Sequence, residues 1–338
     1  MEKRKALISI LNYNGSQDTI NCIKSFYSYE NRKDYCIVIW DNHSKKDQRE
    51  ELRSSLLKLE STLKICTYEQ YHSIDLQDYE IVLVFSYENL GFAKGNNRVI
   101  ENQLDKFEYI ILLNNDTIFE YNTTYHLMNY LDKHASIGVA TSSIYYYYKK
   151  DSVWNAGGKV FFGTRKYYTE KYVNQKIKEK NTEKLVDYIT GCYLVAKSDI
   201  FQKYGLLTEK FFFGEEDYEF CKRMKKNKVK LAVLLDQKIY HKVGASITKN
   251  DLSIISIVRK SFVHHLNRFI DMKEFYSFGF WQLWRLFSSI YIYFLMLKIS
   301  RGNWLLITKY VILLNYYGTM KSDVNKSFFH AVLDGKII

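Results

Sequence analysis

Short apolar runs alternate with stretches of helical spacing through the first half of the chain. The apolar runs are rich in Ile, Val and Leu with little polar alternation, and they occupy residues 6–11, 36–40, 80–85 and 109–113. Runs of this kind are typical of parallel strands that helices cover on both faces. Helical spacing appears between them at 18–29, 48–59 and 92–104. This β-α-β-α order predicts an open α/β sheet, in which ligands bind beyond the carboxyl ends of the strands.

The second half of the chain departs from this pattern. Residues 154–186 are rich in Gly and Lys, which favours a long loop or a short hairpin over the site. Helical spacing returns at 216–226, and 231–235 indicates a further strand. Beyond Ser246, aromatic and aliphatic residues crowd together between 278 and 317, interrupted by basic ones.

This change of character predicts two parts. We expect an α/β domain at residues 1–250 and a C-terminal region of amphipathic helices at 251–338.

Composition fits a folded protein of a reducing compartment. Hydrophobic residues make up 47% of the chain and charged residues 25%, so disorder is not expected. The five cysteines are scattered without a C-x-x-C pair, which argues against a zinc ribbon or a disulfide framework. The basic start of the chain leads into an apolar run that stops at Asn12, which favours a buried first strand over a secretion signal. No apolar run approaches the roughly 18 uncharged residues of a transmembrane helix.

The formal net charge is +12, and its distribution along the chain is uneven. From Asp251 onward there are 11 Lys and Arg residues against 5 Asp and Glu, a net of +6. A basic surface attracts nucleic acid, anionic lipid or a phosphorylated substrate, and charge alone does not choose between them. The basic excess here coincides with aliphatic and aromatic residues, and that combination suits a membrane surface better than nucleic acid.

Polar side chains stand at the ends of the predicted strands. Asp41 ends the second strand, where a carboxylate can accept hydrogen bonds from a ribose hydroxyl or a pyrimidine N–H; an Asx turn or helix cap explains it as well. Asp116 closes the fourth strand, a suitable place for one ligand of Mg²⁺ or Mn²⁺, and a helix cap is again the alternative. His241 is a candidate metal ligand after the strand at 231–235, although a lone His is more often structural.

Two loops carry further candidate chemistry. Residues 89–97 contain Gly91 and Gly95, which suit a loop leading into a helix whose N–H groups face a phosphate or sugar; a plain turn would look the same. The acidic run at 215–217 follows three Phe residues at a predicted helix start, where the helix dipole stabilises carboxylates. One of these acids could act as a general base, and an exposed acidic first turn is the alternative.

Taken in order, these segments resemble the family 2 glycosyltransferases, which have the GT-A fold. The resemblance covers roughly residues 4–250. The matching segments are N-Y-N-G at 12–15, D-N-H-S at 41–44, N-L-G-F-A-K-G-N-N at 89–97, N-N-D at 114–116, W-N-A-G-G at 154–158, T-G-C-Y-L at 190–194, E-D at 216–217, F-C-K-R at 220–223, and His241 with Ser246. Each match is weak alone, and their common order is persuasive. One departure is Asn114, which stands where the metal-binding D-x-D motif has its first Asp, a form also found in rhamnosyl- and galactofuranosyltransferase-like members.

The resemblance implies a role for each site residue. The donor would be bound by Asn12, Tyr13, Asp41, Asn89, Gly95, Asn97 and Asn114, with Tyr13 stacked on the base. The acceptor side would contain Gly158, Thr190, Gly191 and Glu216. Asp116 and His241 would hold a divalent cation, Mg²⁺ or Mn²⁺. Asp217 would take the proton of the acceptor hydroxyl in a single displacement that inverts the anomeric configuration.

The resemblance also implies the partners. The donor would be a nucleotide diphosphate sugar such as dTDP-rhamnose or a UDP-sugar, and the acceptor a lipid-linked saccharide of capsule or O-antigen synthesis. We expect a cytoplasmic enzyme, peripheral on the inner face of the membrane, whose C-terminal helices lie on anionic lipid. The alternatives are a hairpin that dips into the bilayer, packing of these aromatic residues on the α/β domain, and a homodimer contact. No nucleic-acid partner is expected.

Two other functions remain open on sequence. A nucleotidyltransferase would share the α/β sheet but carry a basic Gly-rich loop after the first strand, where only Gly15 is present. A non-catalytic module that binds sugar nucleotides would lack a base such as Asp217.

Overall fold

The computed structural model describes residues 3–59, 62–161, 163–243 and 253–338. Their Cα positions group into two compact units, each described here by itself. The first unit contains Met1–Leu90, Lys94–Leu207 and Phe220–Ile247, and the second contains Gly91–Ala93, Thr208–Glu219 and Thr248–Ile338. The domain boundary predicted at residue 250 lies outside the described residues.

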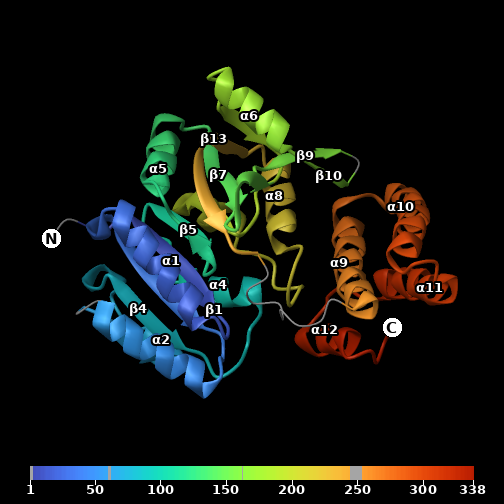
Figure 1. The fold of residues 1–338 in the computed structure, drawn as a ribbon, viewed down its shortest axis with the longest axis horizontal. Coiled ribbons are helices and arrows are strands. Elements are labelled where there is room, and N and C mark those ends of the chain that lie inside the picture. Colours follow the sequence, from blue (N-terminus) through green and yellow to red (C-terminus); the bar gives the residue numbers. More distant parts are fainter. Residues whose placement is uncertain (1–2, 60–61, 162, 244–252) are drawn as a thin grey trace. The chain divides into compact units, whose positions relative to one another are not determined.

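The first unit is built on a mixed sheet (Figure 1). Within the described ranges its strand order is β11-β13-β7-β12-β5-β1-β2-β4-β3, with β6 added to β13 and β8 to β7. The strands are β1 (Ala6–Asn12), β2 (Tyr35–Asp41), β3 (Lys64–Thr67), β4 (Ile81–Phe85), β5 (Tyr109–Asn114), β6 (Thr117–Ile118), β7 (Ile137–Tyr146), β8 (Lys149–Asn155), β11 (Glu183–Val186), β12 (Tyr193–Lys197) and β13 (Lys230–His241). A separate hairpin pairs β9 (Gly158–Phe161) with β10 (Thr164–Tyr167).

The parallel half of this sheet confirms the sequence prediction. Strands β3, β4, β2, β1 and β5 run parallel, and the four predicted strands are found to within one residue at each end. The antiparallel insertion of β12 between β5 and β7 was not predicted. The fold class is therefore α/β with a mixed sheet.

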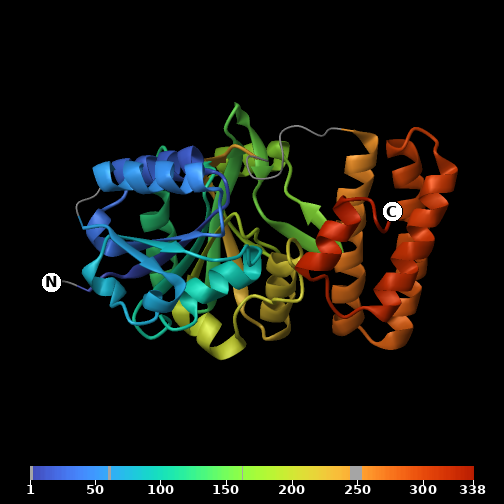
Figure 2. The same cartoon turned by 90° about the horizontal axis from the view of Figure 1, so that it is seen from below.

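Helices cover both faces of the parallel strands, as Figure 2 shows for α1 and α2 on one side and α4 on the other. Alternate side chains of a strand point to opposite faces. Accordingly, Ile8 and Ile10 of β1 join a core that includes Phe26 of α1. Ser9 points the other way and donates a hydrogen bond to Asn96 of α4 at 2.7 Å. The helices that begin in this part of the sequence are α1 (Ser16–Tyr29), α2 (Lys46–Leu59), α3 (Tyr68–Tyr71), α4 (Phe92–Ile100), α5 (Thr123–Lys133), α6 (Glu170–Lys178), α7 (Ser198–Tyr204) and α8 (Glu216–Lys226).

The region from 154 to 186 is more ordered than its composition predicted. The β9–β10 hairpin agrees with the expectation, but helix α6 and strand β11 follow it. Thr169 caps α6 by accepting a hydrogen bond from the Tyr172 N–H at 3.2 Å, and Val173 is its buried residue. A capped helix with a single buried position gives little hydrophobic periodicity, which explains why the sequence suggested a loop.

The second unit consists mainly of α9 (Ile254–Phe275), α10 (Phe278–Ile299), α11 (Trp304–Met320) and α12 (Lys326–Leu333). Trp281 and Trp284, which sequence reasoning placed at a membrane surface, are 1% and 4% exposed and lie in the core of this unit. Phe287, Tyr291 and Phe294 of the same helix are exposed. None of the described helices is both long and apolar enough to span a bilayer.

Two short segments assigned by sequence to the α/β domain group with these helices instead. They are the start of α4, from Gly91 to Ala93, and the stretch before and into α8, from Thr208 to Glu219. Phe92 N donates to Phe212 O at 3.2 Å, and Phe212 N donates to Val324 O at 2.8 Å. Backbone hydrogen bonds between distant segments leave no periodic signal, so this grouping could not be predicted.

Gly91 provides a test of this contact. Its φ is +81°, and an added Cβ would lie 2.1 Å from the carbonyl oxygen of Phe212. We expect Gly91→Ala to destabilise the protein by about 1–3 kcal/mol. Alanine is strained at this positive φ, and the backbone at Phe212 has to move away from the new Cβ. The control is Gly279→Ala in α10, where nothing lies within 4 Å of the added Cβ. That change should stabilise the helix by up to about 1 kcal/mol. Denaturant unfolding measures the change in the free energy of unfolding for each variant. A change of the same sign in both would contradict the close contact between Gly91 and Phe212.

Candidate functional site

The carboxyl ends of β1, β2 and β5 meet at one edge of the sheet. The parallel register places Asn12 opposite Asp41, and Leu11 opposite Asn114. Asn12 Nδ2 donates to Asp41 Oδ2 at 2.8 Å, and both side chains are fully buried. The structure thus brings together the three strand ends that the sequence singled out.

The carboxylate of Asp41 accepts several hydrogen bonds. Besides Asn12, it accepts from Ser44 N at 3.0 Å and from Arg49 Nε at 2.7 Å. The bond from Ser44 N fits the Asx turn that the sequence left open as an alternative. Arg49, which sequence reasoning missed, also donates to Ser86 O at 2.5 Å and lies over the Phe85 ring. Asp41 therefore fastens the strand ends to each other, and its contact with a nucleoside stays a prediction.

Neighbouring residues complete this edge. Asn115 Nδ2 donates to Thr19 Oγ1 at 3.0 Å and so ties the end of β5 to the start of α1. Tyr13 is different, because 42% of the residue is exposed directly after β1. An exposed ring beside a buried polar network has the properties of a stacking surface for a base.

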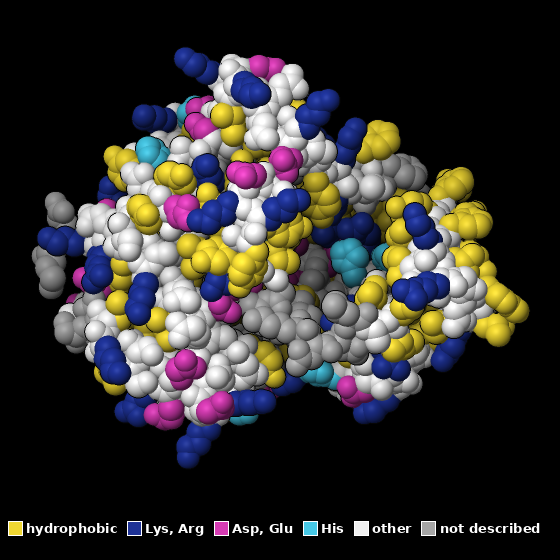
Figure 3. Space-filling model, viewed as in Figure 1, with side chains coloured by type: hydrophobic (Ala, Val, Ile, Leu, Met, Phe, Trp, Pro, Cys, Tyr) yellow, Lys and Arg dark blue, Asp and Glu magenta, His cyan; other side chains and the backbone are white. Residues whose placement is uncertain are grey.

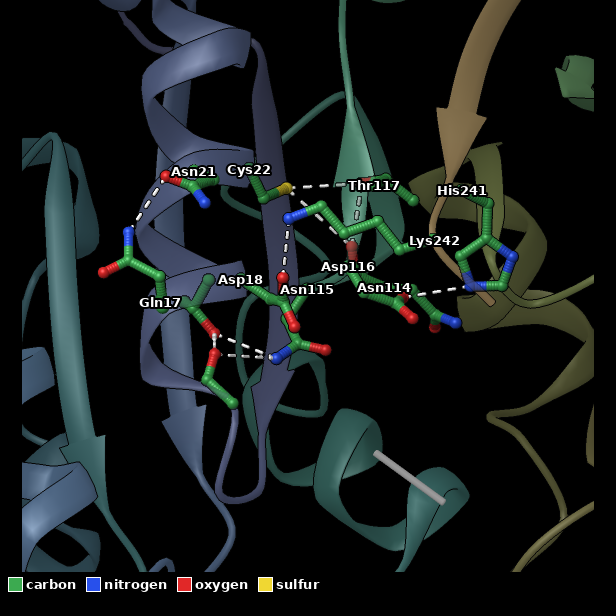
Figure 4. Close-up of polar contacts among 12 residues, drawn as sticks. Gln17, Asp18, Asn21, Cys22, Asn114, Asn115, Asp116, Thr117, His241 and Lys242 are labelled. Atoms are coloured by element: carbon green, nitrogen blue, oxygen red, sulfur yellow. Dashed lines mark hydrogen bonds and ion pairs between the residues drawn. The ribbon is translucent and has the colours of Figure 1, made fainter. Parts of the chain in front are cut away.

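The structure also brings Asp116 and His241 together. Strand β6 pairs antiparallel with the end of β13, with Thr117 opposite His241. As a result, Asp116 Oδ1 lies 3.0 Å from His241 Nε2, and both side chains are 6% exposed. Figure 4 shows this pair with Asn114 beside it. Nearby, Lys242 Nζ lies 2.6 Å from Asp18 Oδ1, an ion pair that the sequence did not predict.

The Asp116–His241 pair fits a divalent cation. Two adjacent ligands of an octahedral cation, each bonded at about 2.1 Å, lie about 3 Å apart, which matches the observed separation. His241 Nδ1 is buried and makes no hydrogen bond within the described residues, while the ring packs against Trp154 at 4.4 Å. Among those residues, no cluster of three or more His, Cys, Asp or Glu side chains could hold a metal. A site with two protein ligands, Asp116 and His241, suits a cation that takes its other ligands from phosphate and water.

The loop from Asn89 to Asn97 has a clear structural role. A Cβ on Gly95 would lie 3.1 Å from the side chain of Leu11, so this glycine allows α4 to approach β1. Asn97 donates from Nδ2 to Leu207 O at 2.9 Å and accepts from Leu207 N at 3.1 Å. The Asn97 side chain therefore fixes the backbone at Leu207, and its contact with a donor stays a prediction. Asn89 is half-buried at the start of the loop.

The acceptor-side candidates of the first unit are Gly158, Thr190 and Gly191. A Cβ on Gly158 would lie 2.3 Å from Lys166 O, so the β9–β10 hairpin requires glycine there. Thr190 is buried, and its Oγ1 accepts a hydrogen bond from Cys192 N at 3.3 Å just before β12. Gly158 thus shapes the hairpin and Thr190 the backbone before β12, and the contact of all three candidates with an acceptor stays a prediction.

The acidic run lies in the second unit, at the start of α8. Glu215 and Glu216 are 2% and 5% exposed, so the alternative of a fully solvated acidic turn is wrong for these two. Asp217 is half-buried in the first turn of the helix. The acids thus occupy different environments, with Asp217 the most accessible of the three.

Comparisons with known proteins agree with this picture. Residues 8–205 match the family described as Glycosyl transferase family 2. A crystal structure of GalNAc-T7 with UDP, GalNAc and Mn²⁺ is similar at 16% identity and a TM-score of 0.53, covering 70% of this chain and 43% of that one. The mannosyltransferase PcManGT from Pyrobaculum calidifontis, in complex with GDP-Man and Mn²⁺, is similar at 12% identity and a TM-score of 0.53, covering 98% of this chain and 86% of that one. The chain thus spans less than half the length of the first of these neighbours. No curated protein sequence matches at a significant level.

The strand order and the similar structures together define a GT-A-like α/β fold. At such low identities the solved structures show the fold alone, whereas the family match covers more than half of the chain. The chain belongs to glycosyl transferase family 2.

Proposed function

We propose that this protein transfers a sugar from a nucleotide diphosphate donor to an acceptor hydroxyl with inversion, and that the reaction depends on a divalent cation. The observation that carries the proposal is the buried Asp116–His241 pair, 3.0 Å apart, beside the polar network at the strand ends. A non-catalytic module or a nucleotidyltransferase would not account for the family match together with the acids at the start of α8.

The donor side follows from the strand ends. The exposed ring of Tyr13 would stack on the base, and Asn12 and Asp41 would form the floor beneath base and ribose. Asn89, Gly95, Asn97 and Asn114 would complete the donor site. Asp116 and His241 would hold Mg²⁺ or Mn²⁺, which supplies Lewis-acid stabilisation of the negative charge on the departing diphosphate. Mn²⁺ in both similar structures supports this assignment.

The acceptor side follows from the acidic helix start. A carboxylate oxygen of Asp217 would accept the proton of the acceptor hydroxyl as its oxygen bonds to the anomeric carbon. The bond from that carbon to the diphosphate oxygen breaks, and its electron pair leaves with the diphosphate. Attack opposite the leaving group inverts the configuration. Gly158, Thr190, Gly191 and Glu216 would shape the acceptor site.

The donor is proposed to be a hexose or deoxyhexose nucleotide such as dTDP-rhamnose or a UDP-sugar. Asn114 in place of the first acid of D-x-D supports this, since rhamnosyltransferase-like members share that form. The similar structures contain UDP and GDP-Man, so UDP- and GDP-sugars should be tested as donors together with dTDP-sugars. The acceptor is proposed to be a lipid-linked saccharide of a capsule or O-antigen pathway.

A lipid-linked acceptor is supported by an apolar face on α10 and α11. The face consists of exposed residues at helical spacing, namely Leu283, Leu286, Phe287, Ile290, Tyr291 and Phe294 of α10 and Leu305, Ile312, Tyr316 and Met320 of α11. Lys298, Arg301 and Lys309 are exposed on the same two helices or the turn between them. Figure 3 shows hydrophobic side chains gathered over α10 and α11 with basic side chains among them. We propose that this face rests on anionic lipid at the inner surface of the membrane, because apolar contact and basic charge both favour it.

The assignment of Asp217 predicts the effect of Asp217→Asn. Loss of a general base lowers rates by about 10²–10⁴-fold, while donor affinity should stay within about threefold. Transfer would be measured with a panel of UDP-, GDP- and dTDP-sugars, and Asp236→Asn, an exposed acid of β13, serves as the control. Transfer by Asp217→Asn within threefold of wild type would rule out this base, and Glu216 would be examined next.

The proposed cation site predicts how transfer and metal binding respond to EDTA and to substitutions at Asp116 and Asn114. EDTA should abolish transfer and Mn²⁺ or Mg²⁺ should restore it. Asp116→Ala should lower the affinity for Mn²⁺ in the presence of the nucleoside diphosphate, as titration calorimetry can measure without turnover. Asn114→Asp should keep activity and strengthen cation binding, because it adds a negative charge beside Asp116. Full transfer in EDTA is the outcome that excludes a metal-dependent reaction.

The apolar face predicts that acidic substitutions on it weaken membrane binding. Burial of a Phe side chain contributes about 1.5–3 kcal/mol, so Phe287→Glu with Phe294→Glu should weaken binding to phosphatidylglycerol vesicles by well over about tenfold. The full-length chain is used, with Leu57→Glu on exposed α2 as the control. If the double Phe variant and the Leu57→Glu control sediment equally with the vesicles, the apolar face does not bind lipid. If the Phe variant instead converts a dimer to a monomer in light scattering, the face is a contact between two copies.

A further inference from the structure

The chain before α8 is held by the C-terminal part of the protein. Phe212 N donates to Val324 O at 2.8 Å, and Val324 N donates to Lys210 O at 2.8 Å. These bonds form a short parallel bridge between Phe211 and Val324, within the second unit. The acidic start of α8 therefore follows a strand-like segment that the helical region fixes in place.

The turn that follows has an unfavourable backbone. Gly214 has a φ of +87° and Glu215 a φ of +80°. Glycine adopts this left-handed region freely, whereas a residue with a Cβ does so at a steric cost. Such a conformation persists only where its surroundings hold it. Because α8 begins at the next residue, this turn sets the direction in which Asp217 is presented.

Asn267 of α9 holds the carbonyl groups of this turn. It is 1% exposed, and its Nδ2 donates to Phe213 O and to Gly214 O, each at 3.0 Å. One amide group thus donates to two consecutive carbonyls, one just before and one within the left-handed bend. These two bonds come from a buried side chain, so Asn267 helps to fix the path of the backbone here.

Arg268, the next residue of α9, holds the side chain of the strained residue. Its Nε lies 3.5 Å from Oε1 of Glu215, whose side chain is 0% exposed. This ion pair places a positive charge beside the buried carboxylate of Glu215 and so favours its position inside the unit. The guanidinium of Arg268 also lies over the ring of Tyr218, 5.5 Å from its centroid, in the first turn of α8.

We propose that Asn267 and Arg268 are positioning residues for Asp217, so that the C-terminal helices contribute to transfer by fixing the start of α8. The inference rests on the proposed role of Asp217 as base. A region that served membrane contact alone would not need two adjacent side chains directed at the turn before that base.

The test compares pairs of full-length variants with a soluble acceptor. Asn267→Ala is matched by Asn315→Ala in α11, since Asn315 Nδ2 also donates two hydrogen bonds, to Ser289 Oγ and Val311 O at 2.9 Å. Arg268→Met is matched by Arg285→Met in α10, since Arg285 also lies over an aromatic ring, that of Trp281 at 4.8 Å. The asparagines each lose two hydrogen bonds, and the arginines each lose a contact with an aromatic ring and a polar partner, Glu215 for Arg268 and Thr319 for Arg285. Only one member of each pair touches the turn.

A displacement of about 1 Å can lower a catalysed rate by about 100-fold. We expect Asn267→Ala and Arg268→Met to lower kcat by about 10- to 100-fold with donor affinity unchanged, and the controls to stay within about threefold. Arg268→Lys, which keeps the charge, should recover part of the loss. In the Asp217→Asn background the Asn267→Ala change should have no further effect on transfer, since the group it positions is already gone.

Hydrogen exchange provides a readout that does not depend on activity. Amides of residues 212–219 should exchange faster in Asn267→Ala than in Asn315→Ala at a temperature where both are folded. Equal exchange in the two variants, or a kcat no lower in Asn267→Ala than in its control, overturns the proposal. If Asp217→Asn keeps wild-type transfer while exchange is faster in Asn267→Ala, the base assignment is wrong and the hold of α9 on the turn stands.

Discussion

Buried amide and carboxylate groups need hydrogen-bond partners, and at the carboxyl ends of β1, β2 and β5 the parallel register supplies them. Asn12 lies opposite Asp41 and donates to it at 2.8 Å, with both side chains fully buried. An unpartnered group there would cost about 1–3 kcal/mol. A slip of one residue would also turn Ile8 and Ile10 away from the core they share with α1. The same register therefore builds the hydrophobic core and fixes the strand-end site.

The sequence predicted the parallel strands because each is a short, continuous apolar run that is buried on both faces. It pointed to Asp116 and His241 separately, and only the family resemblance joined them. What brings them together is β6, a strand of two residues that pairs with the end of β13. A strand so short has no periodicity to detect. Arg49 was missed for a related reason, since its bond to Asp41 comes from the exposed-looking helix α2 and carries no motif.

The C-terminal helices show the limit of composition as a guide. Aromatic and aliphatic richness predicted α10 and α11, but it could not say which rings face outward. Trp281 and Phe287 lie on the same helix, and the first is buried against α9 while the second is exposed. That division depends on neighbouring helices that meet only in the fold. The same applies to Asn267, a polar residue within an apolar helix, whose amide serves a turn more than fifty residues earlier in the chain.

The acidic run at the start of α8 illustrates how a fold separates residues that look equivalent in sequence. Glu215, Glu216 and Asp217 are consecutive, so local pattern gives no reason to prefer one as a base. In the structure Glu215 is strained, fully buried at its side chain and faced by Arg268, which suits a fixed structural group. Glu216 is also buried, whereas Asp217 remains half-exposed. A general base must reach the hydroxyl it deprotonates, so the greater exposure of Asp217 favours its proposed assignment as the base. Strained residues commonly lie beside functional groups. The strain at Glu215 fits this rule, because its backbone fixes the direction in which α8 and Asp217 follow.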